Sequence, residues 1–441
     1  MKIAFCCAED INIGSGYLIA HLKRQGHEVR LFLDPRQYAR GYAQNSLLAR
    51  ILSQRGHILR HIKAYKPDLC LFGPVTANYQ WALSMAEAVK HRLPDCKIIF
   101  GGVHATLVPD EVRKHKFIDE VVVGDGIAYF GGTFDPDKLW PDREIFLEQL
   151  PPIHREYQIF MTSIGCPFNC SYCGNEQMRK VSQFKFIRRS VDGCIAELQY
   201  LKSRGMKYVL FVDDILTCDK KWLLEFMPKY KTEIGLPFCC FGHPKYLDEE
   251  TVAALKDGGC HSIWIGIQTG DEGIRKQILN RPESNKEIVD SCAIVKRHGI
   301  KLIIDHIFGI PAESAISNDI SNNLYTVIKP DIVNCYNLLY FPKAKIIDFA
   351  VSMGNLTPQQ VKEIEEGKGA VYQLTNKNQD FYRQYAKTFC AIPVGGLIAE
   401  ILPMSFIKLI AYARAGRMFI PWAMIQNEIY FTVKSLWRKL T

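Results

Sequence analysis

The sequence predicts an α/β protein with two successive parallel sheets and a helical C-terminal region. Short apolar runs alternate with helical stretches over the first 130 residues. Alternation of the same kind resumes after a proline-containing interval and continues to about residue 345, and the rest of the 441 residues is expected to be helical. Short apolar strands separated by helices are typical of parallel sheets that are covered on both faces. The length alone also favours two or three domains.

The first domain is expected to span residues 1–130 and to be doubly wound, which makes it Rossmann-like. Helices are expected over residues 15–25 and 79–91. Domains of this kind bind ligands beyond the carboxyl ends of their strands, so a binding site is expected at that edge. The strands are expected in the segments KIAFCC, EVRLFL, DLCLFG, KIIFGG and EVVVG.

The second series of strands and helices is expected to span residues 158–345, after a linker over residues 131–157, where four prolines stand in a polar setting. Six strand–helix units are too few for a closed eightfold barrel. We therefore expect a partial (β/α)6 barrel, with its chemistry at the carboxyl ends of the strands. Its strands are expected near residues 159–164, 207–213, 237–242, 262–267, 301–308 and 332–340.

The C-terminal region, residues 346–441, is expected to be helical and ends in an apolar, basic tail from Ala391 to Thr441. Two interpretations of the tail remain open: a helical cap on the barrel, or a helix at the membrane surface with its cations at anionic headgroups. The second would imply peripheral membrane contact and a lipid or isoprenoid substrate. The cations of the tail are Lys408, Arg414, Arg417, Lys434, Arg438 and Lys439.

Composition places the protein in the cytoplasm. Apolar residues make up 48% and charged residues 23% of the chain, as in soluble globular proteins, and no apolar run approaches the length of a membrane span. The N-terminal apolar run is too short for a signal peptide. The net charge of +9 is modest for this length, and no nucleic-acid partner is expected.

Three cysteines stand close together in the stretch IGCPFNCSYCGN. Cys166, Cys170 and Cys173 occupy a glycine-flanked loop just after the first strand of the second series. A structural zinc ion would need a fourth ligand nearby, and none follows. Unligated core cysteines are a further alternative. We favour a [4Fe-4S] cluster held by three thiolates, because it leaves one iron open to a substrate or cofactor.

The CxxxCxxC spacing, with Tyr172 just before the last cysteine and a partial barrel following, resembles the radical S-adenosylmethionine (SAM) enzymes. The segments VDDILT, IWIGIQTG and IFGIPAE fall where that family has characteristic strand ends. The resemblance implies that the open iron chelates SAM. It also implies that reductive cleavage yields a 5'-deoxyadenosyl radical, which abstracts hydrogen from an unactivated carbon. An external electron donor such as flavodoxin or ferredoxin is implied as well.

The same resemblance implies a set of SAM contacts. Tyr172 would lie near the adenine, Gln268 near the ribose or the methionine part, and Gly309, Ile310 and Pro311 beside the nucleoside. Many relatives have glutamate where this chain has Gln268. Asp213 and Asp214 also belong to this expected site, because two adjacent carboxylates at a strand end are unfavourable to bury without partners. The alternative for these strand ends is ordinary barrel closure.

A doubly wound domain before such a barrel resembles the cobalamin-binding subclass of the family. Paired glycines at 101 and 102 let the backbone approach a bulky ligand. Ile11 stands where related cobalamin proteins have a cobalt-binding histidine, so no lower histidine ligand is expected there. His104 is an alternative ligand, and a domain that has lost its cofactor is an alternative to binding. The expected cobalamin contacts are Ile11, Gly14, Thr76, Gly101, Gly102, Val103, His104 and Gly124.

These resemblances imply a cobalamin-dependent radical SAM enzyme that methylates an unactivated carbon of a small molecule. A radical cyclase or rearrangement enzyme that does not use cobalamin as methyl donor is the first alternative. A methylthiotransferase is disfavoured, because the first domain lacks a second set of cluster cysteines. A sensor that binds cobalamin or SAM without turnover is the alternative from a different class, and the intact cysteine trio argues against it.

Overall fold

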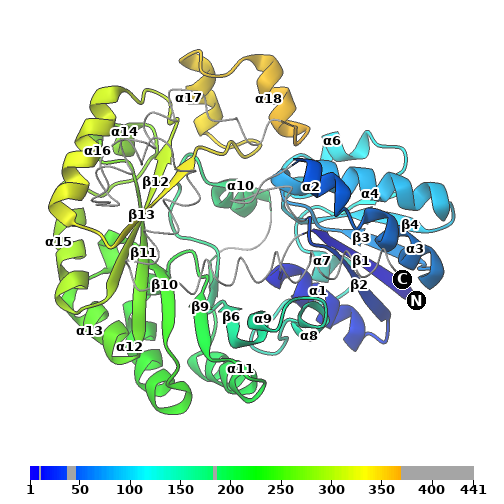
Figure 1. The fold of residues 1–441 in the computed structure, drawn as a ribbon, viewed down its shortest axis with the longest axis horizontal. Helices are drawn as coiled ribbons and strands as arrows, with labels where there is room; N and C mark the ends of the chain where they lie inside the picture. Colours follow the sequence, from blue (N-terminus) through cyan, green and yellow to red (C-terminus); the bar gives the residue numbers. More distant parts are fainter. Residues whose placement is uncertain (9–10, 37–45, 182–185, 369–441) are drawn as a thin grey trace.

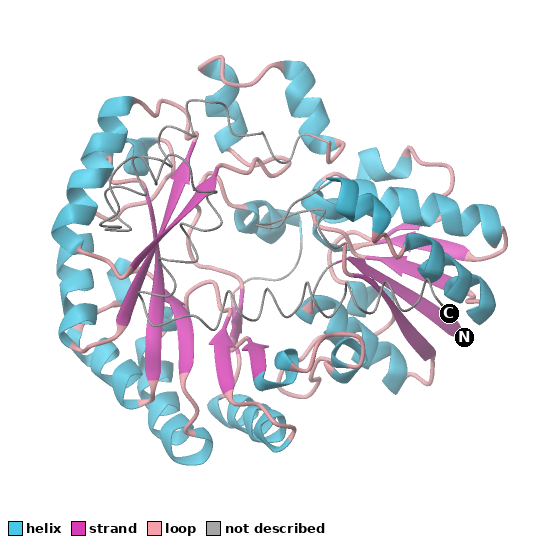
Figure 2. Ribbon diagram, viewed as in Figure 1, coloured by secondary structure: helices cyan, strands magenta, loops and turns pink. Residues whose placement is uncertain are grey.

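The computed structural model describes residues 1–8, 11–36, 46–181 and 186–368. Within these residues two parallel sheets lie side by side, one in the N-terminal part and one in the part coloured green to yellow (Figure 1). Helices flank the first sheet and cover the outer side of the second (Figure 2). Every helix in the described ranges is too short or too polar to cross a bilayer.

The first sheet has the strand order β2-β1-β3-β4-β5, and each neighbouring pair is parallel. Side chains of β1 alternate between its two faces. Ile3 and Phe5 join one apolar cluster with helix α1 (Ile13–Arg24), whereas Ala4 and Cys6 join another with α3 (Arg55–Tyr65) and α4 (Tyr79–Arg92). The doubly wound prediction is therefore confirmed. The strands are β1 (Lys2–Ala8), β2 (Glu28–Asp34), β3 (Leu69–Phe72), β4 (Lys97–Phe100) and β5 (Glu120–Val121).

Shorter helices complete the first domain and lie at its strand ends. The turn η1 and helix α5 follow β3 and β4, so they begin at the carboxyl edge of the sheet, where a ligand of such a domain is expected. The elements are α2 (Ser46–Ile51), η1 (Thr76–Asn78), α5 (Gly102–Leu107), α6 (Pro109–Arg113) and α7 (Gly126–Tyr129).

The segment expected as a linker contains two short helices, α8 (Glu144–Leu147) and α9 (Ile153–Glu156). Phe146 is fully buried in the apolar cluster of β1. Arg143, just before α8, donates to the Ile159 carbonyl at 2.8 Å and to Glu197 at 3.0 Å, and both partners belong to the second series. This segment therefore packs against both sheets.

The second sheet has the strand order β13-β12-β11-β10-β9-β6, with all five neighbouring pairs parallel, as a partial barrel requires. The first expected strand, 159–164, is divided. Its start lies in β6, and its end forms β7, which pairs antiparallel with β8. The division falls at Thr162, whose backbone N–H bonds to the Asp213 carboxylate. The strands are β6 (Tyr157–Phe160), β7 (Ser163–Ile164), β8 (Ile187–Arg188), β9 (Tyr208–Phe211), β10 (Phe238–Gly242), β11 (Cys260–Gln268), β12 (Lys301–Phe308) and β13 (Ile332–Asn337).

Helices cover the outer face of this sheet. Ile263 and Ile265 of β11 and Ile304 of β12 are fully buried in the cluster beneath the helices. Trp264 and Asp305 are next to these residues in sequence, so their side chains lie on the opposite, inner face of the sheet. The helical elements are α10 (Gly174–Val181), α11 (Val191–Ser203), η2 (Leu216–Cys218), α12 (Lys220–Lys229), η3 (Tyr230–Ile234), η4 (Pro244–Tyr246), α13 (Glu249–Asp257), α14 (Glu272–Gln277), α15 (Asn285–Arg297) and α16 (Ala315–Ile328).

The described part of the C-terminal region is helical, with α17 (Ile346–Ser352) and α18 (Pro358–Glu365). Its end meets the first domain, because the Gln80 side chain donates to the Glu366 carbonyl at 2.5 Å. The basic tail from Ala391 to Thr441, with its six cations, lies outside the described residues. Its membrane contact therefore stays a prediction.

Candidate active site

The cysteine loop begins directly after β7, at the carboxyl edge of the second sheet. Cys170 is 8% exposed, and Cys166 and Cys173 are half-buried. Burial raises the pKa of Cys166 to about 12 and that of Cys173 to about 11, and repulsion from Asp214 and Cys170 adds to both shifts. Thiols in this setting stay protonated unless a positive centre binds them as thiolates.

The spacing of the three thiols matters for what they can hold. No three His, Cys, Asp or Glu side chains in the described residues are grouped so that they could hold a metal ion together. In a [4Fe-4S] cluster each cysteine binds a different iron, so the three sulfurs do not need to converge on one ion. Three free thiols on one loop, one buried and two half-buried, fit such a cluster.

The loop is fixed by residues from distant parts of the chain. The Phe168 ring stacks on His243, with centroids 4.2 Å apart and an interplanar angle of 15°. The Ser171 N–H donates to the Leu279 carbonyl at 3.0 Å, and its own carbonyl accepts from Ile346 at 3.0 Å. Arg179 of α10 donates to the carbonyls of Cys166 and Phe168. The cysteines are thereby held in position by the protein itself.

Tyr172 lies in the apolar cluster that also holds Ile310, so the structure brings these two expected nucleoside contacts together. Its hydroxyl accepts a hydrogen bond from Arg281 at 3.2 Å. Burial raises the pKa of Tyr172 well above its usual range. Among the other residues expected beside the nucleoside, Pro311 is buried and Gly309 is exposed.

Asp213 and Asp214 are adjacent in sequence but have different surroundings. Asp213 is fully buried, and its carboxylate accepts from the Thr162 backbone at 3.0 Å, the Thr162 hydroxyl at 2.7 Å and the Ser163 hydroxyl at 2.5 Å. Arg188 lies 3.6 Å from it. These bonds join the end of β9 to the residues just before the cysteine loop. Asp213 therefore positions the loop, and its expected contact with SAM stays a prediction.

Asp214 faces the other way. Its side chain is exposed, yet enclosure by surrounding protein raises the pKa of its carboxyl, while a hydrogen bond from Asn175 opposes that shift. Its charge also contributes to the raised pKa values of Cys166 and Cys173. The structure thus places Asp214 beside the cysteine loop with an accessible carboxylate, as a contact to a cationic part of SAM would need.

The ends of β11 and β12 carry unusual backbone conformations. Gln268 has φ +69° and is 9% exposed, and Gly309 has φ +76°. A non-glycine residue in the left-handed region is strained, and such strain gathers at functional sites. Glu313 accepts from the Gly309 N–H, and burial raises the pKa of Glu313 to about 7. Both strand ends therefore have backbone conformations of the kind found at functional sites, at the positions of the expected SAM contacts.

A cavity of about 320 Å³ lies at the carboxyl edge of the first sheet. Its rim is rich in glycine, so the backbone is accessible to a broad ligand. Met161 and Ile164 of the second series also line it, and Ile164 stands two residues before Cys166. The cavity thus connects the first domain with the start of the cysteine loop. Its glycines are Gly14, Gly73, Gly101, Gly102, Gly124 and Gly126.

Five of the eight expected cobalamin contacts line this cavity, and three do not. Gly14, Gly101, Gly102, Val103 and Gly124 line it. The others, Ile11, Thr76 and His104, are not among the lining residues. The residues that line the cavity include no histidine or cysteine among those that the structure describes, and the expectation of no lower histidine ligand stays a prediction.

His104 is enclosed within the first domain. Its ring packs on Tyr79 with centroids 3.9 Å apart, and its Nδ1 lies 3.1 Å from the Thr76 hydroxyl. Burial lowers the pKa of His104 to about 4. The His104 ring thus packs within the first domain, and its expected role as an alternative cobalt ligand stays a prediction.

Gly102 is the glycine on which the cavity rim depends most. It has φ +76°, and a Cβ there would lie 2.9 Å from the Gly73 carbonyl carbon. We expect Gly102→Ala to lower the free energy of unfolding by about 1–3 kcal/mol and to reduce corrinoid retention. Thermal unfolding and the corrinoid content of purified protein test this. Gly101→Ala is the control for stability alone, because its Cβ would meet Val122 at an ordinary 3.7 Å. Equal free energies of unfolding for the two variants would contradict the structural role given to Gly102.

Sequence reasoning missed several residues near the loop and on the inner face of the barrel. Arg281, Glu283 and His243 are buried next to the cysteine loop, where Arg281 contacts Cys170 and His243 stacks on Phe168. On the inner face, Phe241 and Trp264 stack with centroids 5.3 Å apart. No short motif marks these residues, and only the alternation along β10 and β11 hints at the aromatic pair.

Asp305 is a further missed residue on the inner face. It accepts a hydrogen bond from Asn334 at 3.0 Å, and burial raises the pKa of Asp305 to about 6. The two strands β12 and β13 place these side chains opposite each other in register. A carboxyl group with a raised pKa on the inner face is suited to bind a polar group of a substrate.

Comparison with protein families agrees with both halves of this description. Residues 9–130 match the model of the B12 binding domain, and residues 161–317 match that of the radical SAM superfamily. The two matched regions include the glycine-rich cavity rim and the cysteine loop, respectively.

Curated relatives are distant and differ in activity. An uncharacterized methyltransferase of Pyrococcus horikoshii is 24% identical over 68% of this chain and 70% of its own. A tRNA-2-methylthio-N(6)-dimethylallyladenosine synthase of Sulfurihydrogenibium sp. is 28% identical over 53% of this chain and 58% of its own. An anaerobic magnesium-protoporphyrin IX monomethyl ester cyclase of Rubrivivax gelatinosus is 21% identical over 72% of this chain and 62% of its own.

Solved structures share the fold. The radical SAM methyltransferase TsrM from Kitasatospora setae, solved with cobalamin and a [4Fe-4S] cluster bound, superposes with a TM-score of 0.62 at 12% identity, covering 78% of this chain and 76% of that one. The cobalamin-dependent SAM radical enzyme OxsB, solved with aqua-cobalamin bound, gives 0.66 at 10% identity, covering 94% and 72%. Radical SAM enzymes need a reductant. The chain belongs to the B12-binding radical SAM enzyme family, and its cofactors are a [4Fe-4S] cluster, SAM and cobalamin.

Proposed function

We propose that this protein methylates an unactivated carbon of a small molecule. The observation that carries the proposal is the position of the cavity. It is lined both by the glycines of the first domain and by Ile164, which leads into the cysteine loop. A corrinoid in the cavity and a cluster on the loop would therefore face a common space, as a methyl carrier and a source of hydrogen abstraction must in such a reaction.

The chain's own residues divide the work between binding and orientation. When bound, the cofactors supply hydrogen abstraction and carry the methyl group. The cysteine loop holds the cluster, and Asp214 presents a carboxylate beside it. Gly101 and Gly102 leave room for the corrinoid, while Gln268 and the segment 309–311 hold the SAM nucleoside and methionine. In this proposal Asp213 holds the ends of β6 and β9 together beneath the site.

Specific residues argue against two of the three alternative functions. A methylthiotransferase would need a second cluster, but Cys6, Cys70 and Cys96 are buried in the core of the first sheet. A sensor without turnover would not need three cysteines placed to hold a cluster with an open iron. A radical cyclase or rearrangement enzyme uses the same cluster loop, so only product identification separates it from a methyltransferase.

The substrate class is proposed from the inner face of the barrel. The stacked pair Phe241 and Trp264 offers an apolar platform, and Asp305 with Asn334 offers a polar anchor on the same face. These residues suit a largely apolar small molecule with one polar group, which includes lipids and isoprenoids. The electron donor is proposed to be flavodoxin or ferredoxin, in keeping with the one-electron reduction that the cluster requires.

Labelled SAM tests the proposal directly. Anaerobically reconstituted protein with cobalamin that carries no methyl group, a reductant and SAM carrying a trideuterated methyl group is incubated with cell extract, and the products are analysed by mass spectrometry. A methyltransferase gives a cobalamin-dependent product that carries the labelled methyl group. A product without the label, formed equally without cobalamin, would favour the cyclase or rearrangement alternative.

A further inference from the structure

The segment that follows helix α14 lies against the cysteine loop. The Ser171 hydroxyl donates to the Ile278 carbonyl at 2.5 Å, and the Asn280 side chain donates to the Asn169 carbonyl at 2.7 Å. Arg281 reaches further, with Nη1 4.0 Å from the Cys170 sulfur and 3.2 Å from the Tyr172 hydroxyl. A guanidinium group is thus placed directly beside one of the three thiols.

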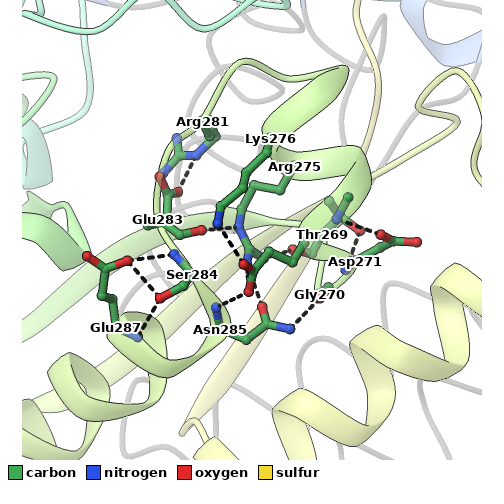
Figure 3. Close-up of polar contacts among 12 residues, drawn as sticks. Thr269, Gly270, Asp271, Arg275, Lys276, Arg281, Glu283, Ser284, Asn285 and Glu287 are labelled. Carbon is green, nitrogen blue, oxygen red and sulfur yellow. Dashed lines mark hydrogen bonds and ion pairs between the residues drawn. The ribbon is translucent and has the colours of Figure 1, made fainter.

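Arg275 fixes the segment that carries Arg281. Figure 3 shows its side chain among the polar contacts between the end of β11 and the start of α15. It is fully buried and donates to the Thr269 carbonyl at 2.7 Å, the Glu283 carbonyl at 3.0 Å and the Asn285 side chain at 2.5 Å. Because three separate acceptors hold Arg275, the backbone that bears Arg281 and Glu283 has little freedom to move.

The charge of Arg281 is buried together with the Glu283 carboxylate. Arg281 is 6% exposed, and Glu283, 3% exposed, accepts its Nε–H at 2.6 Å. The other Glu283 oxygen lies 3.5 Å from Nε2 of His243, and burial lowers the pKa of His243 to about 2, so that ring is neutral. Charges in such a setting are screened far less than charges at the surface.

We propose that Arg281 is a positioning residue: it holds a positive charge and an N–H donor against Cys170 and thereby raises the reduction potential of the cluster. The Glu283 carboxylate partly offsets this charge. Reduction brings one electron from a low-potential one-electron carrier to the bound cluster. The negative charge beside Cys170 grows by one unit, and no covalent bond forms or breaks. Hydrogen bonds to cluster sulfurs and nearby charges are known determinants of cluster potentials.

Substitutions that change one charge at a time test this. In Arg281→Met the reduced-to-oxidised ratio of the cluster at a fixed potential is expected to fall about tenfold, equal to a shift of about 59 mV for one electron. In Glu283→Gln the ratio is expected to rise by a similar factor. Arg281→Lys keeps the charge and is expected to restore most of the wild-type ratio. The measurement is a redox titration of reconstituted, SAM-free protein, followed by electron paramagnetic resonance of the reduced cluster.

Glu287→Gln is the matched control. Glu287 stands four residues after Glu283 in the same segment, but it is exposed and caps α15, so its charge is screened by water. Its substitution is expected to leave the potential unchanged.

Two results would overturn the proposal: unchanged potentials in both Arg281→Met and Glu283→Gln at full iron content, or shifts of the same sign in both. If Arg281→Met does not retain iron, Glu283→Gln decides alone, because a potential that does not rise refutes the assignment. The titration requires neither substrate nor methyl transfer. Its outcome is therefore independent of the proposed methylation.

Discussion

Replacing Cys166, Cys170 or Cys173 by alanine is expected to abolish both the iron–sulfur cluster and SAM cleavage. Each thiol would ligate a different iron of the cluster, and the remaining iron is the one left open for SAM. Loss of one ligand therefore removes a corner that no other described thiol is placed to replace. Iron and sulfide content, the visible absorption of the cluster and the yield of 5'-deoxyadenosine measure the effect.

Cys218→Ala is the control for these variants. Cys218 is half-buried and bonded to Arg188, outside the loop, and its replacement is expected to leave the iron content unchanged. A triple variant that lacks Cys166, Cys170 and Cys173 but still carries a full complement of iron would contradict the assignment of these cysteines as cluster ligands.

Asp213→Ala is expected to destabilise the second domain severely, by about 3–5 kcal/mol, because it leaves buried donors and the Arg188 charge without their acceptor. The same bonds hold the segment before the cysteine loop, so cluster incorporation should also fall. Denaturant unfolding, followed by a probe in the barrel, and iron content measure the two effects.

Asp214→Asn provides the contrast one residue away. Its side chain is exposed, so we expect stability close to that of the wild type, with weakened SAM binding and reduced cleavage. If both variants unfolded at the same denaturant concentration, the inference that the two carboxylates have distinct roles would be wrong.

The two sheets could be predicted because their strands are short apolar runs that pack on both faces. Ile3 and Cys6 of β1 point to opposite clusters, as a doubly wound sheet requires. The cysteine loop was visible because its ligands are local in sequence. The packing of residues 131–157 could not be predicted, because the burial of Phe146 depends on a sheet formed elsewhere in the chain.

Other parts of the site depend on contacts that no local pattern reveals. Arg281 meets Cys170 across 111 positions of sequence, and nothing in the segment around Arg281 marks it as a neighbour of the loop. Asp213 and Asp214 are identical residue types, and only the direction of each side chain at the end of β9 separates a positioning role from a binding one. For His104, the first turn of α5 decides that its ring meets Tyr79 and not the cavity.

Methyl transfer and radical formation are both proposed for this one protein, and the two products of SAM report on these reactions separately. The decisive measurement quantifies S-adenosylhomocysteine and 5'-deoxyadenosine in one anaerobic incubation of reconstituted protein with SAM, a reductant and cell extract, with and without cobalamin. The proposed function predicts both products, with S-adenosylhomocysteine formed only when cobalamin is present. Formation of 5'-deoxyadenosine alone, in equal amounts with and without cobalamin, would contradict it.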